Sequence, residues 1–334
     1  MCKIQIATAI LAWGLGYCGM VLAADFFTDA KEAGDDYAYQ GEYTGKVAQN
    51  GKTVELGLQV IAGGNGKFTA VLYTGGLPGA GWTRESEPGE KLSGTVEKGA
   101  LQLTGKLSRV EVAPGGTAAK LTIPDQPQPI SLAKVDRASP TLGAKPPEGA
   151  IVLYGGKDDK KHWQGGSVTE DGLLASHPGG NLVCDQELGD FTLHLEFRTP
   201  FMPTASGQGR GNSGVYLQNR YELQVLDSFG LSGENNECGG FYQVAQPLVN
   251  MCLPPLVWQT YDIDFTGAKF DAAGKKTANA KVTVKHNGVV IHDNVEFKNV
   301  TPGGVGQEAP GRGPLMMQDH GNPVAYRNIW VIKK

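Results

Sequence analysis

Apolar and polar residues alternate with a period of two along most of this chain, which predicts short β-strands. Residues 53–60 and 67–73 both alternate, and the Gly63-Gly64-Asn65-Gly66 stretch between them predicts a hairpin turn. Further short runs follow at 91–97, 100–107, 120–123 and 130–135, and no helical period of comparable length interrupts them. We therefore expect residues 25–136 to form a small antiparallel sandwich or barrel.

A proline-rich stretch follows this first part. Residues 137–149 read RASPTLGAKPPEG, which is typical of an interdomain linker. Alternation then resumes over residues 150–334, and the many short runs predict two stacked antiparallel sheets. In one of these runs His194 and Glu196 share the polar side of a strand, and we interpret them as a surface pair. We also interpret His162, His177 and His292 as surface residues.

The N-terminal residues carry a targeting pattern. Lys3 precedes an apolar run over 4–22 that ends in Val21-Leu22-Ala23, so residues 1–23 are predicted to be a signal peptide of a periplasmic or secreted protein. The run is also long enough for a membrane anchor, because about 20 apolar residues span a bilayer. Lipidation of Cys18 is a third interpretation, disfavoured by the bulky Tyr17 before it.

Removal of this segment leaves Cys184, Cys238 and Cys252. Three cysteines permit one disulfide, for which Cys238 and Cys252 enclose the shortest loop. Three buried free thiols are the alternative. The sequence has no zinc-spaced cysteine or histidine cluster, so it does not predict a structural zinc.

Composition narrows the function classes. The 334 residues include 48 glycines and 19 prolines without a G-X-Y period, which favours a turn-rich all-β protein over collagen. The net charge of −4 offers no basic surplus for phosphates, so nucleic acid is excluded as the expected partner.

Three polar stretches stand out, at 210–227, 238–242 and 318–328. They combine carboxylate, amide, guanidinium, imidazole and phenol groups, which suits a polyhydroxylated ligand that needs many directional hydrogen bonds. The alternative is a polar sheet face that simply meets water. In the first part, Trp82 and Arg84 are candidates for a sugar contact, although a loop aromatic is more often packed.

Eight motifs in order resemble the bacterial 3-keto-disaccharide hydrolase family: GNSGVY, RYELQVLDSFG, CGGFY, WQTYDIDF, FDAAGKK, HNG, DN and GPLMMQDHGNPVAYRNIWV. The resemblance covers about residues 150–334 and implies a concanavalin A-like jelly-roll β-sandwich, with residues 25–136 as an accessory domain outside it. It also implies a carbohydrate substrate whose glucose unit carries a ketone at C3.

A C3 ketone acidifies the C2 proton, so a base can start an elimination that expels the group on C1, and water then adds back. Retaining glucanases of this architecture instead carry E-x-D-x-E on a strand. This chain has Glu222-Leu223-Gln224 there, and an amide cannot replace a carboxylate in a double displacement.

We therefore expect Glu222 and His320 to transfer protons and Arg210 to stabilise the enolate. The residues expected to hold sugar hydroxyls are Asn212, Tyr216, Gln224, Asp227, Tyr242 and Asn322. No cofactor is firmly implied, and a divalent cation held by Asp227 and Asp319 is the alternative route to a polarised ketone. A non-catalytic carbohydrate-binding module and a conventional β-glucanase are the competing functions.

Overall fold

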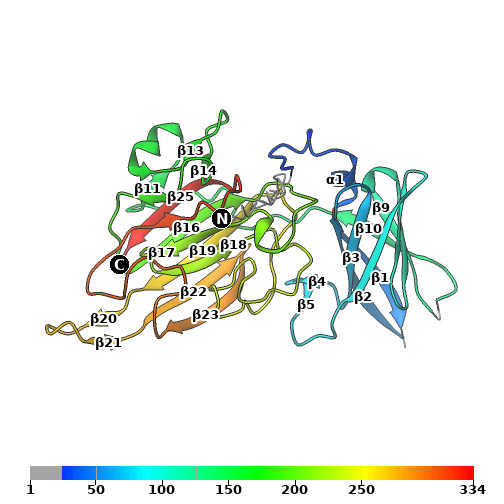
Figure 1. Cartoon of the computed structure of the whole chain (residues 1–334). Coiled ribbons are helices and arrows are strands. Elements are labelled where there is room, and N and C mark those ends of the chain that lie inside the picture. The colour runs from blue at the N-terminus through cyan, green and yellow to red at the C-terminus, as the bar shows by residue number, and fades with distance from the viewer. Residues whose placement is uncertain (1–24, 50, 125) are drawn as a thin grey trace, which may run out of the picture.

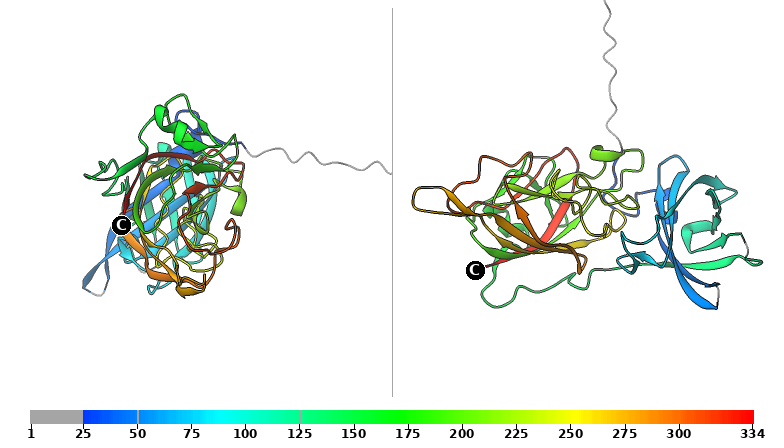
Figure 2. Two further views of the ribbon diagram at one scale, coloured as in Figure 1. Left: turned by 90° about the vertical axis from the view of Figure 1, so that its left-hand side faces the viewer. Right: turned by 90° about the horizontal axis from the view of Figure 1, so that it is seen from below.

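The computed structural model describes residues 25–49, 51–124 and 126–334, and the chain is all-β, as predicted. The predicted signal peptide lies outside the described residues. A β-barrel and a β-sandwich lie side by side (Figures 1 and 2). The helices in the described ranges are short, and none is long and apolar enough to cross a membrane. They are α1 (Asp35–Tyr39), η1 (Pro114–Gly116), η2 (Lys157–His162) and η3 (Gly207–Gly209).

The first part is a closed antiparallel barrel, the second of the two architectures expected for it. Its strands follow the order β1-β10-β9-β8-β7-β6-β3-β2. They are β1 (Gly41–Gln49), β2 (Lys52–Ala62), β3 (Lys67–Thr74), β6 (Glu90–Glu97), β7 (Ala100–Thr104), β8 (Arg109–Val112), β9 (Ala118–Thr122) and β10 (Ile130–Val135). Closure pairs every strand on both edges, so the barrel exposes no open sheet edge.

The predicted hairpin is formed by β2 and β3, which pair from Gly57 opposite Tyr73 to Ala62 opposite Phe68. Its turn holds Gly64, Asn65 and Gly66 at φ values of 77°, 55° and 69°. Glycine adopts this left-handed conformation without steric cost and asparagine tolerates it, which explains the residues found there. A loop after β3 adds the short parallel pair β4 (Leu77–Pro78) and β5 (Gly81–Trp82).

The second part is a sandwich of two antiparallel sheets. The larger sheet runs β13-β14-β25-β16-β19-β22-β23, with β11 paired to β25, and the smaller runs β12-β15-β24-β17-β18. The larger sheet contains β11 (Ile151–Tyr154), β13 (Ser167–Val168), β14 (Leu174–Ala175), β16 (Phe191–Arg198), β19 (Gln259–Thr266), β22 (Ala280–His286), β23 (Val289–Phe297) and β25 (Ala325–Lys333). The smaller contains β12 (Trp163–Gln164), β15 (Leu182–Cys184), β17 (Ser213–Leu217), β18 (Tyr221–Val225) and β24 (Met316–Met317), and a separate ribbon pairs β20 (Lys269–Phe270) with β21 (Lys276–Ala278).

Each body has its own apolar core, and alternation selects the residues that enter it. On β16, Leu193, Leu195 and Phe197 face the smaller sheet, whose Val215 and Leu223 face back.

The three cysteines are free and buried, which is the second of the two states considered for them. His292, which the pattern leaves as a surface residue, is also buried, and its Nε2 lies 2.6 Å from the carbonyl oxygen of Gly239.

The side chain of Phe201 connects the sandwich to the barrel. Phe201 leaves the sandwich after β16 but belongs to the barrel core, where it is fully buried. It forms an isolated antiparallel bridge with Phe27 and packs edge-on against Tyr37, with ring centroids 5.2 Å apart.

The loop after β3 also reaches the sandwich, because Trp82 packs on the sandwich core and Arg84 donates to the Gly233 carbonyl at 2.6 Å. Both loop residues therefore have structural contacts.

The stretch predicted as a linker is bound to both bodies. Arg137 forms two 2.6 Å hydrogen bonds with the Glu42 carboxylate of the barrel. Residues 139–144, which we call the strap, then cross the outer face of the larger sheet. There the Gly143 amide donates to Glu196 at 2.6 Å, and the Thr141 hydroxyl donates to Asp262 at 2.6 Å. The connection is thus a fixed spacer.

The strap covers a buried charged cluster. His194 and Glu196 are each 1% exposed, so the interpretation as a surface pair is wrong. Burial alone would lower the pKa of His194, but hydrogen bonds to Asp262 and Glu196 outweigh it and raise the pKa to about 8. Burial alone would raise the pKa of Glu196, but hydrogen bonds from His194, Asn328, the Gly143 amide and Arg327 lower it to about 2. Period two could not reveal this burial, because the cover comes from a distant segment.

We expect the stability of the protein to fall as the pH rises through about 8. The folded state holds a proton on His194 there that the unfolded chain, with a pKa of 6.5, has already lost. This contribution is complete below pH 6.5, and the shift corresponds to about 2 kcal/mol. Urea denaturation from about pH 6 to about pH 9 measures it. His194→Gln should flatten this part of the profile, whereas His162→Gln, at a half-exposed pair with Asp185, should retain it. An unchanged profile in His194→Gln would contradict the assignment.

Candidate functional site

The candidate site lies on the outer face of the smaller sheet, where β17 pairs with β18. Tyr216 lies opposite Glu222, and Gly214 lies opposite Gln224. Because side chains alternate, these residues share one face while Val215 and Leu223 enter the core on the other. A strand that is apolar on one side thus presents a row of polar groups on its other side.

Glu222 is the central ionisable group of this face. The Glu222 side chain is 3% exposed. Burial raises its pKa and a hydrogen bond from Tyr216 lowers it, to a net value of about 7. The Gln318 side chain donates to the Tyr216 hydroxyl at 3.1 Å. The carboxyl lies against the backbone of Gly214, since a Cβ there would come within 2.5 Å of Oε1. A carboxyl with a pKa near 7 can accept and return a proton at neutral pH.

A cluster of amides lies at the Gln224 end of the same face. The side-chain amides of Gln224 and Asn212 both donate to Gln208 Oε1 at 3.2 Å. Within the described part of the chain, Gln224 Oε1 and Asn212 Oδ1 are buried without a hydrogen-bond partner. Buried acceptors of this kind carry a desolvation cost that a ligand hydroxyl offsets. Asn322 supports the cluster, because its Oδ1 accepts from the backbone amide of Asn212 at 2.8 Å.

Arg210 and Asp227 form a buried ion pair beside this cluster. Arg210 Nε lies 2.6 Å from Asp227 Oδ2, and its two terminal nitrogens lie 3.4 Å from the Ala62 carbonyl of the barrel. Tyr242 adjoins the opposite end of the site, where its backbone amide donates to the Glu222 carbonyl. The guanidinium expected to stabilise an enolate is therefore engaged at the contact between the two bodies.

Two of the candidates in the last polar stretch, His320 and Asp319, have surroundings that differ from those of Glu222. His320 is exposed, and no contact among the described residues joins it to Glu222. Its neighbour Asp319 is half-buried, and its carboxylate lies 3.0 Å from His177 Nδ1. His177 is another histidine that the pattern leaves as a surface residue.

No group of three or more histidine, cysteine, aspartate or glutamate side chains with metal-binding geometry occurs among residues 25–49, 51–124 and 126–334. Asp227 is paired with Arg210, and Asp319 with His177, so each aspartate has a different neighbour. The donor set expected for a divalent cation is not assembled by these two carboxylates.

Three residues of this region were not selected from the sequence: Gln208, Gln318 and His177. The sequence does point to Gln318, because this residue begins the polar stretch at 318–328. No sequence pattern points to Gln208 or His177. Their positions depend on contacts between loops, and the alternation of apolar and polar residues carries no information on such contacts.

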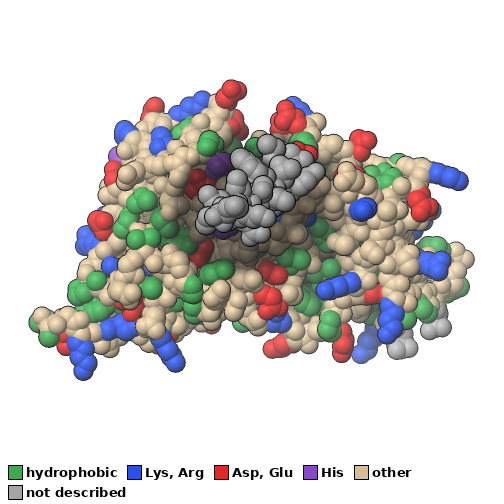
Figure 3. Space-filling view, in the orientation of Figure 1, with side chains coloured by type: hydrophobic (Ala, Val, Ile, Leu, Met, Phe, Trp, Pro, Cys, Tyr) green, Lys and Arg blue, Asp and Glu red, His purple; other side chains and the backbone are tan. Residues whose placement is uncertain are grey.

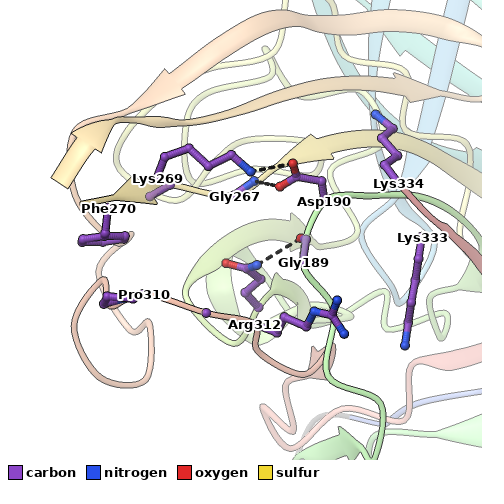
Figure 4. A pocket seen from close by; sticks show the side chains of 12 residues that line it. Gly189, Asp190, Gly267, Lys269, Phe270, Pro310, Arg312, Lys333 and Lys334 are labelled. Atoms are coloured by element: carbon purple, nitrogen blue, oxygen red, sulfur yellow. Dashed lines mark hydrogen bonds and ion pairs between the residues drawn. The ribbon is translucent and has the colours of Figure 1, made fainter. Parts of the chain in front are cut away.

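Two of the cavities that adjoin the sandwich contain no residue of the candidate site. One, of about 670 Å³, is lined by residues that include His177, Arg198, Asp171, Thr169 and Asp29. The middle of the face in Figure 3 shows acidic and histidine side chains together. The other cavity, of about 330 Å³, lies at Asp190, Lys269, Arg312 and Lys333 (Figure 4) and contains no residue of the candidate site. Its carboxylate, Asp190, is paired with Lys269 at 2.6 Å.

Comparison with known proteins agrees with the motifs. Residues 149–332 match the family model described as a 3-keto-alpha-glucoside-1,2-lyase-like domain, which confirms the resemblance. A candidate glycosyl hydrolase of known structure from Parabacteroides distasonis is 35% identical, with a TM-score of 0.51, over 56% of this chain and 85% of that one. A second from the same organism is 19% identical, with a TM-score of 0.37, over 55% of this chain and 99% of that one. No curated protein matches the chain.

Replacing Tyr216 with phenylalanine should raise the pKa of Glu222 above about 7, because the hydroxyl favours the charged carboxylate. Infrared difference spectra of the carboxyl stretch against pH measure this, with Glu222→Gln identifying the band. Met316→Leu, on the neighbouring strand opposite Tyr216, keeps the hydroxyl and serves as the control. A titration midpoint that stays the same or falls in Tyr216→Phe would show that this hydrogen bond does not stabilise the carboxylate.

Proposed function

The chain belongs to the family of 3-keto-alpha-glucoside-1,2-lyase-like domains, and we propose that it cleaves 3-keto-glycosides, including 3-keto-disaccharides, by elimination followed by hydration. Family membership and the glycosyl hydrolase-like neighbour support a glycoside-acting enzyme with a carbohydrate substrate. The ketone requirement and the order of steps form the finer part of the proposal.

The chemistry needs one well-placed base. A ketone at C3 makes the C2 proton acidic, so a carboxylate can remove it and leave an enolate. The enolate re-forms the ketone, a double bond forms between C1 and C2, and the C1–oxygen bond breaks. Water then adds its oxygen to C1, and C2 regains a proton. The sum of both steps is hydrolysis of the glycoside.

The observation that carries the proposal is the buried carboxyl of Glu222. Its pKa of about 7 suits a group that takes the C2 proton in the first step and returns it in the second. Tyr216 orients it, and the unpartnered oxygens of Gln224 and Asn212 provide acceptors for sugar hydroxyls. Glu222, Gln224 and Asn212 thus combine a base with a binding surface.

Two other functions fit these residues less well. A conventional β-glucanase needs a second carboxylate near the first. Gln224, whose amide cannot act as that carboxylate, occupies the next position on this face. A non-catalytic carbohydrate-binding module has no need of a buried carboxyl, whose desolvation is costly. The elimination route uses that carboxyl and requires no second one.

The test compares a 3-keto-disaccharide with its unoxidised parent in heavy water. The enzyme should release sugar from the keto compound only, and NMR should find deuterium at C2 of the keto product, because the exchanged carboxyl returns a solvent deuteron. Glu222→Gln should reduce turnover by about 10²-fold or more. Gln224→Ala, a matched change on the same face, should act mainly on KM. Cleavage without deuterium at C2 would overturn the elimination route.

We further propose that the enzyme acts in the periplasm or outside the cell. The support is the sequence of residues 1–23 alone, a charged start followed by an apolar run and a small-residue ending. N-terminal sequencing of protein from the native host should begin at Ala24 or Asp25. A retained Met1, or a lipid on Cys18, would contradict this.

A further inference from the structure

The side chain of Gln208 sets the orientation of the two amides at the end of the candidate site. Its Oε1 accepts from the side-chain nitrogens of Gln224 and Asn212, each at 3.2 Å, and its own nitrogen donates to the Asn236 carbonyl at 2.8 Å. A side-chain amide has a donor end and an acceptor end. Because Gln208 attracts the donor end of both amides, their oxygens, which have no partner among the described residues, point away from it.

This orientation determines what the amides offer to a sugar. Two unpartnered oxygens accept hydrogen bonds, so a sugar hydroxyl satisfies them by donating. If either amide turned over, its NH₂ group would face the sugar instead, and the same hydroxyl would have to accept. Gln208 therefore fixes the hydrogen-bonding character of this end of the site.

The loop that carries Gln208 lies between two contacts with the barrel. We call residues 202–211 the Gln208 loop. Phe201, just before it, is fully buried in the barrel core. Near its other end, the two terminal nitrogens of Arg210 lie 3.4 Å from the Ala62 carbonyl, at the end of β2.

A third contact lies at the turn between β2 and β3. A Cβ built on Gly64 would come within 2.7 Å of the Thr204 methyl and 3.6 Å of the Pro203 carbonyl carbon, so this turn packs directly against the Gln208 loop. Gly66 belongs to the same turn and has a similar φ, 69° against 77°, but a Cβ there would meet nothing within 4 Å.

We infer that Gln208 is a positioning residue for sugar binding, and that the barrel is part of this machinery because it holds the Gln208 loop in place. The inference rests on the proposed function, in which Gln224 and Asn212 bind sugar hydroxyls. It gives a role in the reaction to the barrel, which lies outside the matched residues 149–332. Gln208 acts through the two amides, so it affects binding and leaves the proton transfers at Glu222 unchanged.

The role of Gln208 is tested by kinetics of the full-length enzyme on a 3-keto-disaccharide. Gln208→Leu removes the shared acceptor at similar volume and should raise KM by about 10-fold, the effect of losing ordinary hydrogen bonds, with kcat nearly unchanged. Gln208→Glu keeps oxygen acceptors at this position and should recover part of the loss. A purely structural role would give no such recovery.

The role of the barrel is tested by a matched pair of variants in one turn. Asparagine tolerates the left-handed conformation, so Gly64→Asn and Gly66→Asn carry similar backbone strain. Only the side chain at 64 displaces the Gln208 loop. Gly64→Asn should therefore raise KM by about 3-fold or more, again with kcat nearly unchanged, whereas Gly66→Asn should keep the wild-type KM.

A double variant shows whether the barrel acts through Gln208. In Gly64→Asn combined with Gln208→Leu, KM should equal that of Gln208→Leu alone, because the orientation of the amides is already lost. Thr204→Leu enlarges the other side of the same contact and repeats the test if Gly64→Asn does not fold.

The possible results separate this inference from the proposed function. An unchanged KM in Gln208→Leu would overturn the role of Gln208. Equal KM values in Gly64→Asn and Gly66→Asn, or fully additive effects in the double variant, would overturn the role of the barrel. Each of these results leaves the elimination intact. A wild-type enzyme that cleaves no 3-keto-glycoside would overturn the proposed function, and this inference with it.

Discussion

The antiparallel pairing of β17 with β18 is the constraint on which the candidate site depends. One register places Tyr216 opposite Glu222 and Gly214 opposite Gln224, and it also turns Val215 and Leu223 into the core. A slip of one residue would bury the polar row in the core and expose the apolar one. The apolar face therefore fixes the geometry of the polar face, and the free energy of core packing maintains the position of the carboxyl.

The same constraint explains what the sequence could predict. Alternation is a local property, so it found the β2–β3 hairpin and the sandwich strands, and it placed Glu222 and Gln224 on one face. The motifs around them identified the family. The buried state of Glu222 was not accessible this way, because an alternating strand has the same pattern whether its polar face meets water or a covering loop.

Residues joined by long-range contacts could not be found by any local pattern. His177 and Asp319 meet across 142 positions, and the strap reaches Glu196 across 53. Each contact depends on where a loop closes over a sheet, which is decided by packing and backbone geometry rather than by period. His320 illustrates the converse, because its polar neighbours made it a candidate although its side chain points to solvent.

The strap also changes the entropy of the connection between the two bodies. A flexible tether leaves each body many orientations, and these are lost whenever the bodies dock. Here Arg137 is held by Glu42 at one end, and the following residues lie on the larger sheet at the other. Most of that orientational freedom is therefore removed within the connection itself. A small number of direct contacts, such as Phe201 in the barrel core and Arg210 on the Ala62 carbonyl, then suffices to hold the barrel beside the sandwich.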